Sequence, residues 1–167
     1  MGFTEAILPY FRSSGSHASL FRAMCLDITH DLDIDRASVW VAEGISRDLV
    51  LQAGFDRRDC SFDAGTTLPS AMHPLYFAEL LVQEFIQVDE ALADMRVASM
   101  RASYLVPEGV VALLDHIVAG PGGRAVVLCC EQAATGHRPW RDKDRQYLVA
   151  MTRLLDQALR ESWKSGA

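Results

Sequence analysis

The sequence has little positive charge. Its 167 residues include 16 Lys and Arg against 22 Asp and Glu, which gives a formal net charge of −6 at pH 7. A nucleic-acid-binding domain usually presents a basic patch or stripe, and an anionic membrane attracts basic segments. We therefore predict that neither nucleic acid nor a membrane surface is a partner of this chain.

Long apolar runs, targeting segments and metal-ligand spacings are also missing. No apolar run approaches the roughly 18 residues of a membrane-spanning helix, and the first residues lack the basic and apolar regions of a signal peptide. The five histidines are not paired four residues apart, and the four cysteines show no metal-ligand spacing. We expect a cytoplasmic protein with reduced cysteines, no metal site and no disulfide framework.

The most informative stretch is Gly122–Glu131, in which a Gly-Gly turn leads into the apolar residues 125–130. A half-exposed strand alternates apolar with polar residues, so an unbroken apolar run predicts a strand that is covered on both faces. Neighbouring residues of a strand point to opposite faces. Cys129 and Cys130 are therefore expected on opposite faces of the sheet, and so are Asp115 and His116.

The rest of the chain is predicted to contain helices and pairs of strands. Apolar residues at helical spacing predict helices near 16–32, from Pro74 onward and over 142–163, besides a short helix over 4–12. Strands are predicted over 37–41, 48–52, 85–88, 110–118 and 125–130, with one short extended piece over 62–68. Residues 89–104 are expected to form irregular helical turns. Strands that arrive as hairpins predict an α+β domain built on an antiparallel sheet.

Short motifs in a fixed order resemble a GAF domain. They are Tyr104–Val110, Leu114–Asp115, Gly123–Arg124, Leu128–Glu131 and Arg138–Trp140, preceded by Ala37–Trp40, His73–Phe77 and Val88–Asp89. The resemblance covers roughly residues 20–159 and is strongest for the GAF modules of bacterial sensor histidine kinases and cyclic-dinucleotide signalling proteins. It implies a single domain over 1–167, with its core at about 20–160 and an N-terminal extension at 1–15.

The resemblance also implies a particular arrangement of the elements. We expect a GAF-like, PAS-related α+β fold with a central antiparallel sheet of about six strands. The terminal helices are expected to pack on one face of this sheet. The middle helix and the loops are expected to cover a pocket on the other face.

In function, the resemblance implies a non-catalytic sensory domain that binds an unidentified small molecule. It further implies a homodimer formed through the terminal helices, and a separate kinase or cyclase as a possible output protein. Two alternatives stay open, a purely structural dimerisation module and a thiol-based redox sensor or enzyme similar to free methionine-(R)-sulfoxide reductase. The chain lacks the Asn-Lys-Phe-Asp-Glu signature of cyclic-nucleotide-binding GAF domains and a Cys-His bilin attachment motif, so no cofactor is expected.

Aromatic walls with a few convergent polar groups are typical of small-molecule sites. On this basis the candidate ligand-binding residues are Tyr76, Phe77, Tyr104 and Asp115. The aromatic residues among them could equally be core residues. Asp89 and Arg101, on the covering segment, are added as contacts for a polar ligand, although they could equally be solvated. Free cysteines on a buried strand usually serve as small apolar residues, so no catalytic residue is predicted and only Cys60, in a polar loop, is a candidate for a reactive thiol.

Overall fold

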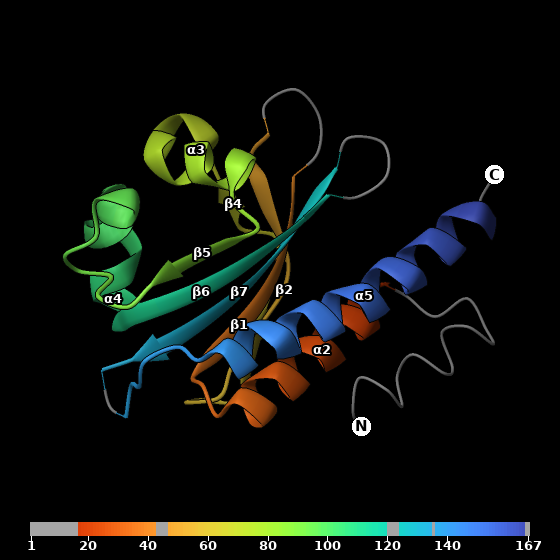
Figure 1. Cartoon of the computed structure of the whole chain (residues 1–167), viewed down its shortest axis with the longest axis horizontal. Coiled ribbons are helices and arrows are strands. Elements are labelled where there is room, and N and C mark those ends of the chain that lie inside the picture. Colours follow the sequence, from red (N-terminus) through yellow and green to blue (C-terminus); the bar gives the residue numbers. More distant parts are fainter. Residues whose placement is uncertain (1–16, 43–46, 120–123, 135, 166–167) are drawn as a thin grey trace.

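An antiparallel sheet of seven strands forms the centre of the structure (Figure 1). The structure is a computed structural model that describes residues 17–42, 47–119, 124–134 and 136–165. The predicted helix over 4–12 and the N-terminal extension lie outside these residues. Six strands follow the order β3-β2-β1-β7-β6-β5, and β4 pairs with β2. The strands are β1 (Arg36–Ala42), β2 (Leu49–Asp56), β3 (Ser61–Asp63), β4 (Thr67–Leu68), β5 (Phe85–Val88), β6 (Val110–Ala119) and β7 (Ala125–Ala133).

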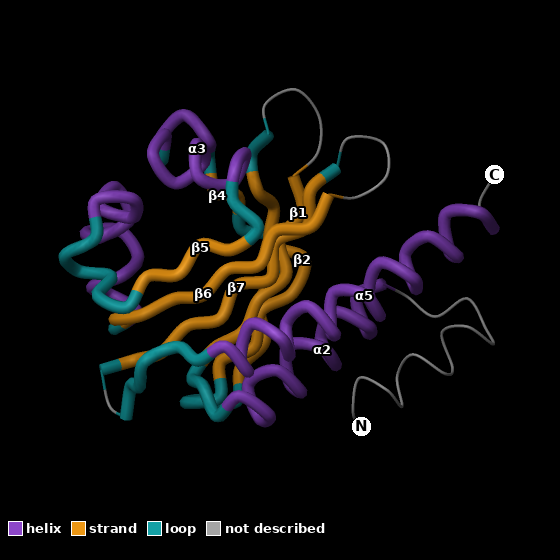
Figure 2. Tube along the Cα trace, in the orientation of Figure 1, coloured by secondary structure: helices purple, strands orange, loops and turns teal. Residues whose placement is uncertain are grey.

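Helices cover both faces of the sheet (Figures 1 and 2). The long helices α2 (His17–Leu32) and α5 (Asp142–Ser165) lie together on one face. The other face carries α3 (Pro74–Val82) and a chain of short turns. These turns are the 3₁₀ helices η1 (Ser70–Met72) and η2 (Met95–Met100), the π-helical turn η3 (Arg101–Leu105) and the short helix α4 (Val106–Glu108).

The predicted doubly covered strand is β7, which lies between β1 and β6. Val126, Leu128 and Cys130 pack into the apolar cluster beneath α2 and α5. Val127 and Cys129 alternate with them and pack into a second cluster beneath α3, η2 and η3. The prediction of a strand buried on both faces is therefore confirmed.

The alternation on β6 places two neighbouring titratable residues on opposite faces, as predicted. Asp115 faces the α3 side, where it accepts a hydrogen bond from Tyr76. His116 faces α5, where its Nε2 lies 3.1 Å from Thr152 Oγ1 and its ring stacks on Phe85. Burial lowers the pKa of His116 to about 4. Its imidazole is therefore a neutral part of the core at neutral pH.

The predicted α+β fold, a central antiparallel sheet with helices on both faces, is confirmed with one local difference. The single extended piece predicted over 62–68 is two short strands, β3 and β4, and both pair with β2. Gly65 has φ of 88° and lies between them, a backbone conformation that glycine adopts without strain. This turn folds the segment over the open edge of β2, and so builds one wall of a cavity.

Candidate functional site

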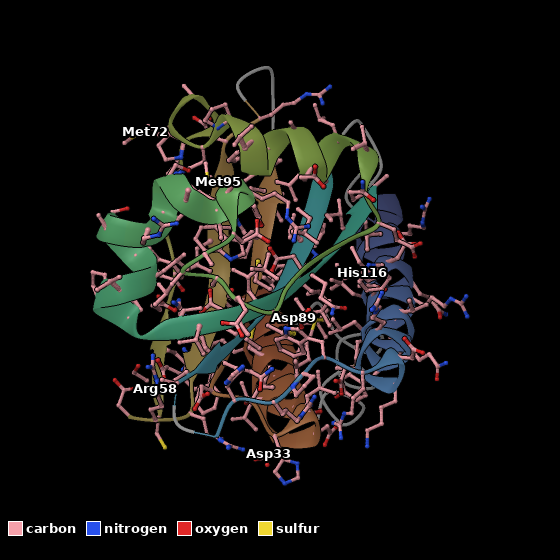
Figure 3. The ribbon with its side chains drawn as sticks, turned by 60° about the vertical axis from the view of Figure 1, so that its left-hand side comes forward. Asp33, Arg58, Met72, Asp89, Met95 and His116 are labelled. Carbon is pink, nitrogen blue, oxygen red and sulfur yellow. The ribbon has the colours of Figure 1, made fainter. Side chains whose placement is uncertain are left out.

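A cavity of about 570 Å³ lies between the sheet and the segments that cover it on the α3 side. Its floor comes from β1, β2, β6 and β7, and its walls come from β3, β4, η1 and η3. This volume falls within the usual range of small-molecule sites, about 300–1,000 Å³. Figure 3 shows the segments that cover this face, with His116 beside α5 and away from them.

A chain of hydrogen-bonded polar groups crosses the cavity floor. Arg36 on β1 lies opposite Glu131 on β7 in the strand register. Arg36 Nη1 donates to Tyr104 Oη at 2.6 Å, and the Tyr104 hydroxyl lies 2.7 Å from each carboxylate oxygen of Glu131. Arg36 Nη2 donates to Asp63 Oδ2 at 2.8 Å. The side chains of Arg36 and Glu131 are each only 9% exposed, so the sheet holds a charge pair inside the protein.

The charges of these hydrogen-bonded groups shift one another's pKa values. Burial disfavours the charged form of Glu131 and raises its pKa, although Arg36 and the Tyr104 hydroxyl oppose this shift. Burial also disfavours the charge on Arg36, but Glu131, Tyr104 and Asp63 outweigh it and raise the pKa of Arg36. The guanidinium therefore stays charged and fixes the position of both carboxylates.

Tyr76 and Asp115 form a second buried hydrogen-bonded pair in the same cavity. Tyr76 Oη donates to Asp115 Oδ2 at 2.6 Å, and Asp115 lies opposite Cys129 in the pairing of β6 with β7. Asp115 is 3% exposed. Burial raises the pKa of Asp115 to about 7, against the hydrogen bonds of Tyr76 and Cys129, which lower it. The carboxyl group of Asp115 thus titrates close to neutral pH.

Gly54 on β2 leaves space for the Arg36–Asp63 pair. A Cβ atom at this position would collide with Asp63 Oδ1 and would lie 3.0 Å from Arg36 Nη2. We expect Gly54→Ala to push the Asp63 carboxylate away and to lower the free energy of unfolding by about 1–2 kcal/mol. Chemical denaturation measures this change. In an Asp63→Ala background the same substitution is expected to cost clearly less, and equal costs in both backgrounds would contradict this role of Gly54.

The structure brings three of the six predicted site residues to the cavity, namely Tyr76, Tyr104 and Asp115. Phe77 is the next residue after Tyr76 on α3, and it packs edge-on against Tyr76 in the apolar cluster. Asp89 follows the edge strand β5 and accepts hydrogen bonds from Gln87 at the surface. Phe77, Asp89 and Arg101 are not among the residues that line the cavity.

Sequence reasoning missed three charged residues of the cavity, Arg36 and Glu131 on its floor and Asp63 on its wall. A signal for Glu131 was present, because it follows Val127 and Cys129 at two-residue intervals and so shares their face of β7. Arg36 stands at the start of β1, where a charged residue ordinarily faces solvent. Its burial depends on β3 and Tyr104, which come from distant parts of the chain.

The cysteines contribute three buried thiols. Cys25, Cys129 and Cys130 are buried, and burial raises the pKa of each of them. Cys60 is exposed, at the turn before β3.

Within the parts of the chain that the structure describes, no three His, Cys, Asp or Glu side chains are grouped so that they could hold a metal ion.

The sequence matches no protein-family model and no curated protein sequence. Solved structures of similar fold are numerous. The phycoerythrobilin-bound GAF domain of a cyanobacterial phytochrome matches with a TM-score of 0.76 at 14% identity, over 99% of this chain and 96% of that chain. The GAF domain of an Acinetobacter phosphoenolpyruvate-protein phosphotransferase matches with a TM-score of 0.72 at 14% identity, over 99% and 95%.

A third similar structure is the GAF domain of a two-component sensor histidine kinase from Bacillus halodurans. Its TM-score is 0.62 at 20% identity, over 85% of this chain and 95% of that chain. The chain has the GAF-domain fold. Within this fold the cavity lies between the sheet and the covering segments, on the face opposite the terminal helices. None of the helices in the described part of the chain has the length and hydrophobicity needed to cross a membrane.

Proposed function

We propose that this GAF domain is a non-catalytic sensory domain that binds a small molecule in the cavity above β1, β7 and β6. The observation that carries the proposal is the set of buried ionisable groups on the cavity floor, Arg36, Asp115 and Glu131. Burying charge is unfavourable and stabilises a fold poorly compared with apolar packing. Such groups cluster in functional sites, where they supply specific polar contacts.

Aromatic side chains complete the site. Trp40, Tyr76 and Tyr104 line the same cavity and supply apolar contact area beside the polar floor. The phytochrome neighbour binds phycoerythrobilin, but this chain lacks a Cys-His attachment motif. The buried Cys129 thiol, whose pKa is raised, is a poor nucleophile for covalent attachment. A non-covalently bound small molecule fits these residues better than a bilin.

Ligand binding is tested by filling the cavity from its rim. Ser103 is exposed and lines the cavity, whereas its neighbour Ala102 is exposed and does not. In a thermal-shift screen with a metabolite library, a ligand present at 100 times its Kd is expected to raise the Tm of the wild-type protein by roughly 5–10 °C. Ser103→Trp abolishes the shift and Ala102→Trp, the matched control, retains it. A library without any hit, or a hit that Ser103→Trp leaves unchanged, contradicts the proposal.

The thiol-based alternative is tested by the reactivity of the cysteines. A reactive cysteine needs an accessible thiolate, and only Cys60 is exposed. We expect Ellman's reagent to modify one thiol in the native protein within minutes and the other three only after unfolding. A Cys60→Ser variant is then unreactive when native. Rapid modification of Cys129 would favour the redox alternative instead.

Dimerisation through the terminal helices is the second part of the proposal. Leu26 on α2 and Leu154 on α5 are 38% and 40% exposed, and two-fold dimers are the commonest oligomers. We expect Leu154→Asp to convert a dimer into a monomer in light scattering after size-exclusion chromatography. Val82→Asp on α3, where the valine is 74% exposed, leaves the dimer intact. A wild-type monomer would contradict this part. The output partner that we propose is a separate kinase or cyclase.

A further inference from the structure

The lining of the cavity carries far more acidic than basic groups. Among the described residues, the lining contains one arginine and one histidine against six carboxyl groups, Asp56, Asp59, Asp63, Glu108, Asp115 and Glu131. Three of the six have a cationic partner, since Asp56 pairs with Arg58, whereas Asp63 and the more distant Glu131 share Arg36. This excess of carboxyl groups favours a positively charged ligand over an anionic one.

Asp115 shows this imbalance most clearly. It is 3% exposed, and no Lys, Arg or His within the described residues lies at ion-pair distance from it. Its two hydrogen-bond donors, Tyr76 Oη and the Cys129 thiol, are uncharged. A buried carboxylate normally requires a cation or must give up its charge. This carboxyl group faces a cavity large enough to admit such a cation.

Glu131 lies close enough to Asp115 to contact the same cation. On the paired strands β6 and β7, Asp115 is opposite Cys129 and Leu113 is opposite Glu131. Asp115 and Glu131 are thus diagonal neighbours on one face of the sheet, and the Cα atoms of such neighbours are roughly 7–8 Å apart. A single ammonium group placed between them reaches both carboxyl groups. Trp40, Tyr76 and Tyr104 line the same space, and aromatic rings attract organic cations.

We propose that the ligand of this cavity is a small organic cation, an amine whose ammonium group binds between Asp115 and Glu131 while its apolar part contacts the aromatic walls. This inference rests on the proposed function and narrows it to one chemical class. Metabolites with phosphate or carboxylate groups as their main feature are disfavoured, because the floor offers one guanidinium, and Asp63, Tyr104 and Glu131 already share it.

Binding of such a cation is coupled to the protonation of Asp115. The ammonium group prefers the ionised carboxylate, so binding releases a proton whenever Asp115 starts protonated. Affinity then rises up to tenfold per pH unit below about pH 7, the pKa of Asp115, and levels off above it. The other titratable or charged side chains around Asp115 are Tyr76, Cys129, Glu131, Arg36, Tyr104 and, at the rim, His73.

Titration of these neighbours would not produce the same dependence of ligand affinity on pH. Tyr76, Tyr104 and Cys129 have pKa values raised well above neutral by burial, so they stay protonated. Arg36 stays charged. Burial lowers the pKa of His73, which favours its neutral ring. Burial raises the pKa of Glu131, and Arg36 opposes this shift. The Asp115→Asn variant separates any contribution of Glu131 from that of Asp115.

The experiment compares phenyl compounds that differ mainly in charge and adds n-butylammonium, a cation without an aromatic ring. Binding of benzylammonium, n-butylammonium, benzyl alcohol and benzoate to the wild-type protein is measured by NMR titration at pH 6.0 and 7.5. We expect at least one of the two cations to bind at least tenfold more tightly than benzyl alcohol, with weaker binding at pH 6.0 and no binding of benzoate. Asp115→Asn keeps the acceptor for Tyr76 but removes both the preference for the cation and the pH dependence.

Asp89→Asn is the matched control, because Asp89 is a surface carboxylate outside the cavity, and it retains the wild-type behaviour. Failure of both cations to bind, tighter binding of benzoate, or a cation preference that survives in Asp115→Asn overturns the inference. The proposed function fails separately, when the metabolite library gives no hit that depends on Ser103. A Ser103-dependent hit that is neutral or anionic retains the sensory function and rejects the cation.

Discussion

Replacing Arg36 with methionine is expected to lower the free energy of unfolding at pH 7.5 by about 3–5 kcal/mol. The substitution keeps much of the apolar volume but removes the guanidinium that pairs with Glu131, so that Glu131 remains buried without this counter-charge. Denaturation by urea, monitored by circular dichroism, measures the loss. Arg57→Met is the control, because the Arg57–Asp33 pair lies at the surface and contributes at most about 1 kcal/mol.

The pH dependence of this variant identifies the cause. Without Arg36 the folded-state pKa of Glu131 rises further above its unfolded value, so the folded state binds the extra proton. Stability is therefore lost as the pH rises from the unfolded-state pKa of Glu131 through its higher folded-state pKa. The variant is expected to recover part of its lost unfolding free energy at pH 5. The double variant Arg36→Met/Glu131→Gln recovers much of the loss at pH 7.5. A loss that is equal at both pH values and persists in the double variant contradicts a charge-pair role.

Asp144→Ala is expected to cost about 3 kcal/mol, through the attachment of α5. The Asp144 carboxylate is completely buried at the start of α5 and accepts from Arg138 Nη1 at 2.6 Å and from the backbone N–H of Arg141 at 2.8 Å. The second of these bonds is one half of a capping box. Arg138 also donates to Leu32 O at the end of α2, so one carboxylate ties together both terminal helices.

Asp156→Ala on the same helix is the matched control, because Asp156 forms a surface pair with Arg160 and its loss is expected to cost less than about 1 kcal/mol. Burial opposes the charge of Asp144, but the bonds from Arg138 and Arg141 outweigh it and hold its pKa below the ordinary value. Its contribution is therefore present at neutral pH and is lost as pH falls below about 4. Equal unfolding free energies for the two alanine variants contradict the proposed role of Asp144.

The fold could be predicted from local patterns because its main elements carry strong ones. The apolar run 125–130 identified β7, and the stripe on 142–163 identified α5. The division of 62–68 into β3 and β4 could not be predicted, because both strands are only two or three residues long and exist through pairing with β2. Such short pairings depend on tertiary contacts rather than on the composition of the segment.

The candidate site was predictable in part for a related reason. Tyr76 and Tyr104 could be named because aromatic side chains are typical of small-molecule sites. Asp115 could be named because it interrupts the apolar run of β6. Tyr104 reaches the cavity from the π-helical turn η3 and Arg101 does not, and the irregular pitch of such a turn cannot be anticipated from helical periodicity. The partners Arg36 and Glu131 meet only through the pairing of β1 with β7.

The resonance of the Trp40 indole N–H tests most directly whether the cavity binds a small molecule. Trp40 lines the cavity and donates to Ser38 Oγ at 2.9 Å, whereas Trp140 packs in the apolar cluster under α2 and α5, on the opposite face of the sheet. On addition of a hit from the metabolite screen to ¹⁵N-labelled protein, we expect the Trp40 signal to shift in a saturable manner while the Trp140 signal stays in place. An unmoved Trp40 signal at saturating ligand would contradict binding in this cavity.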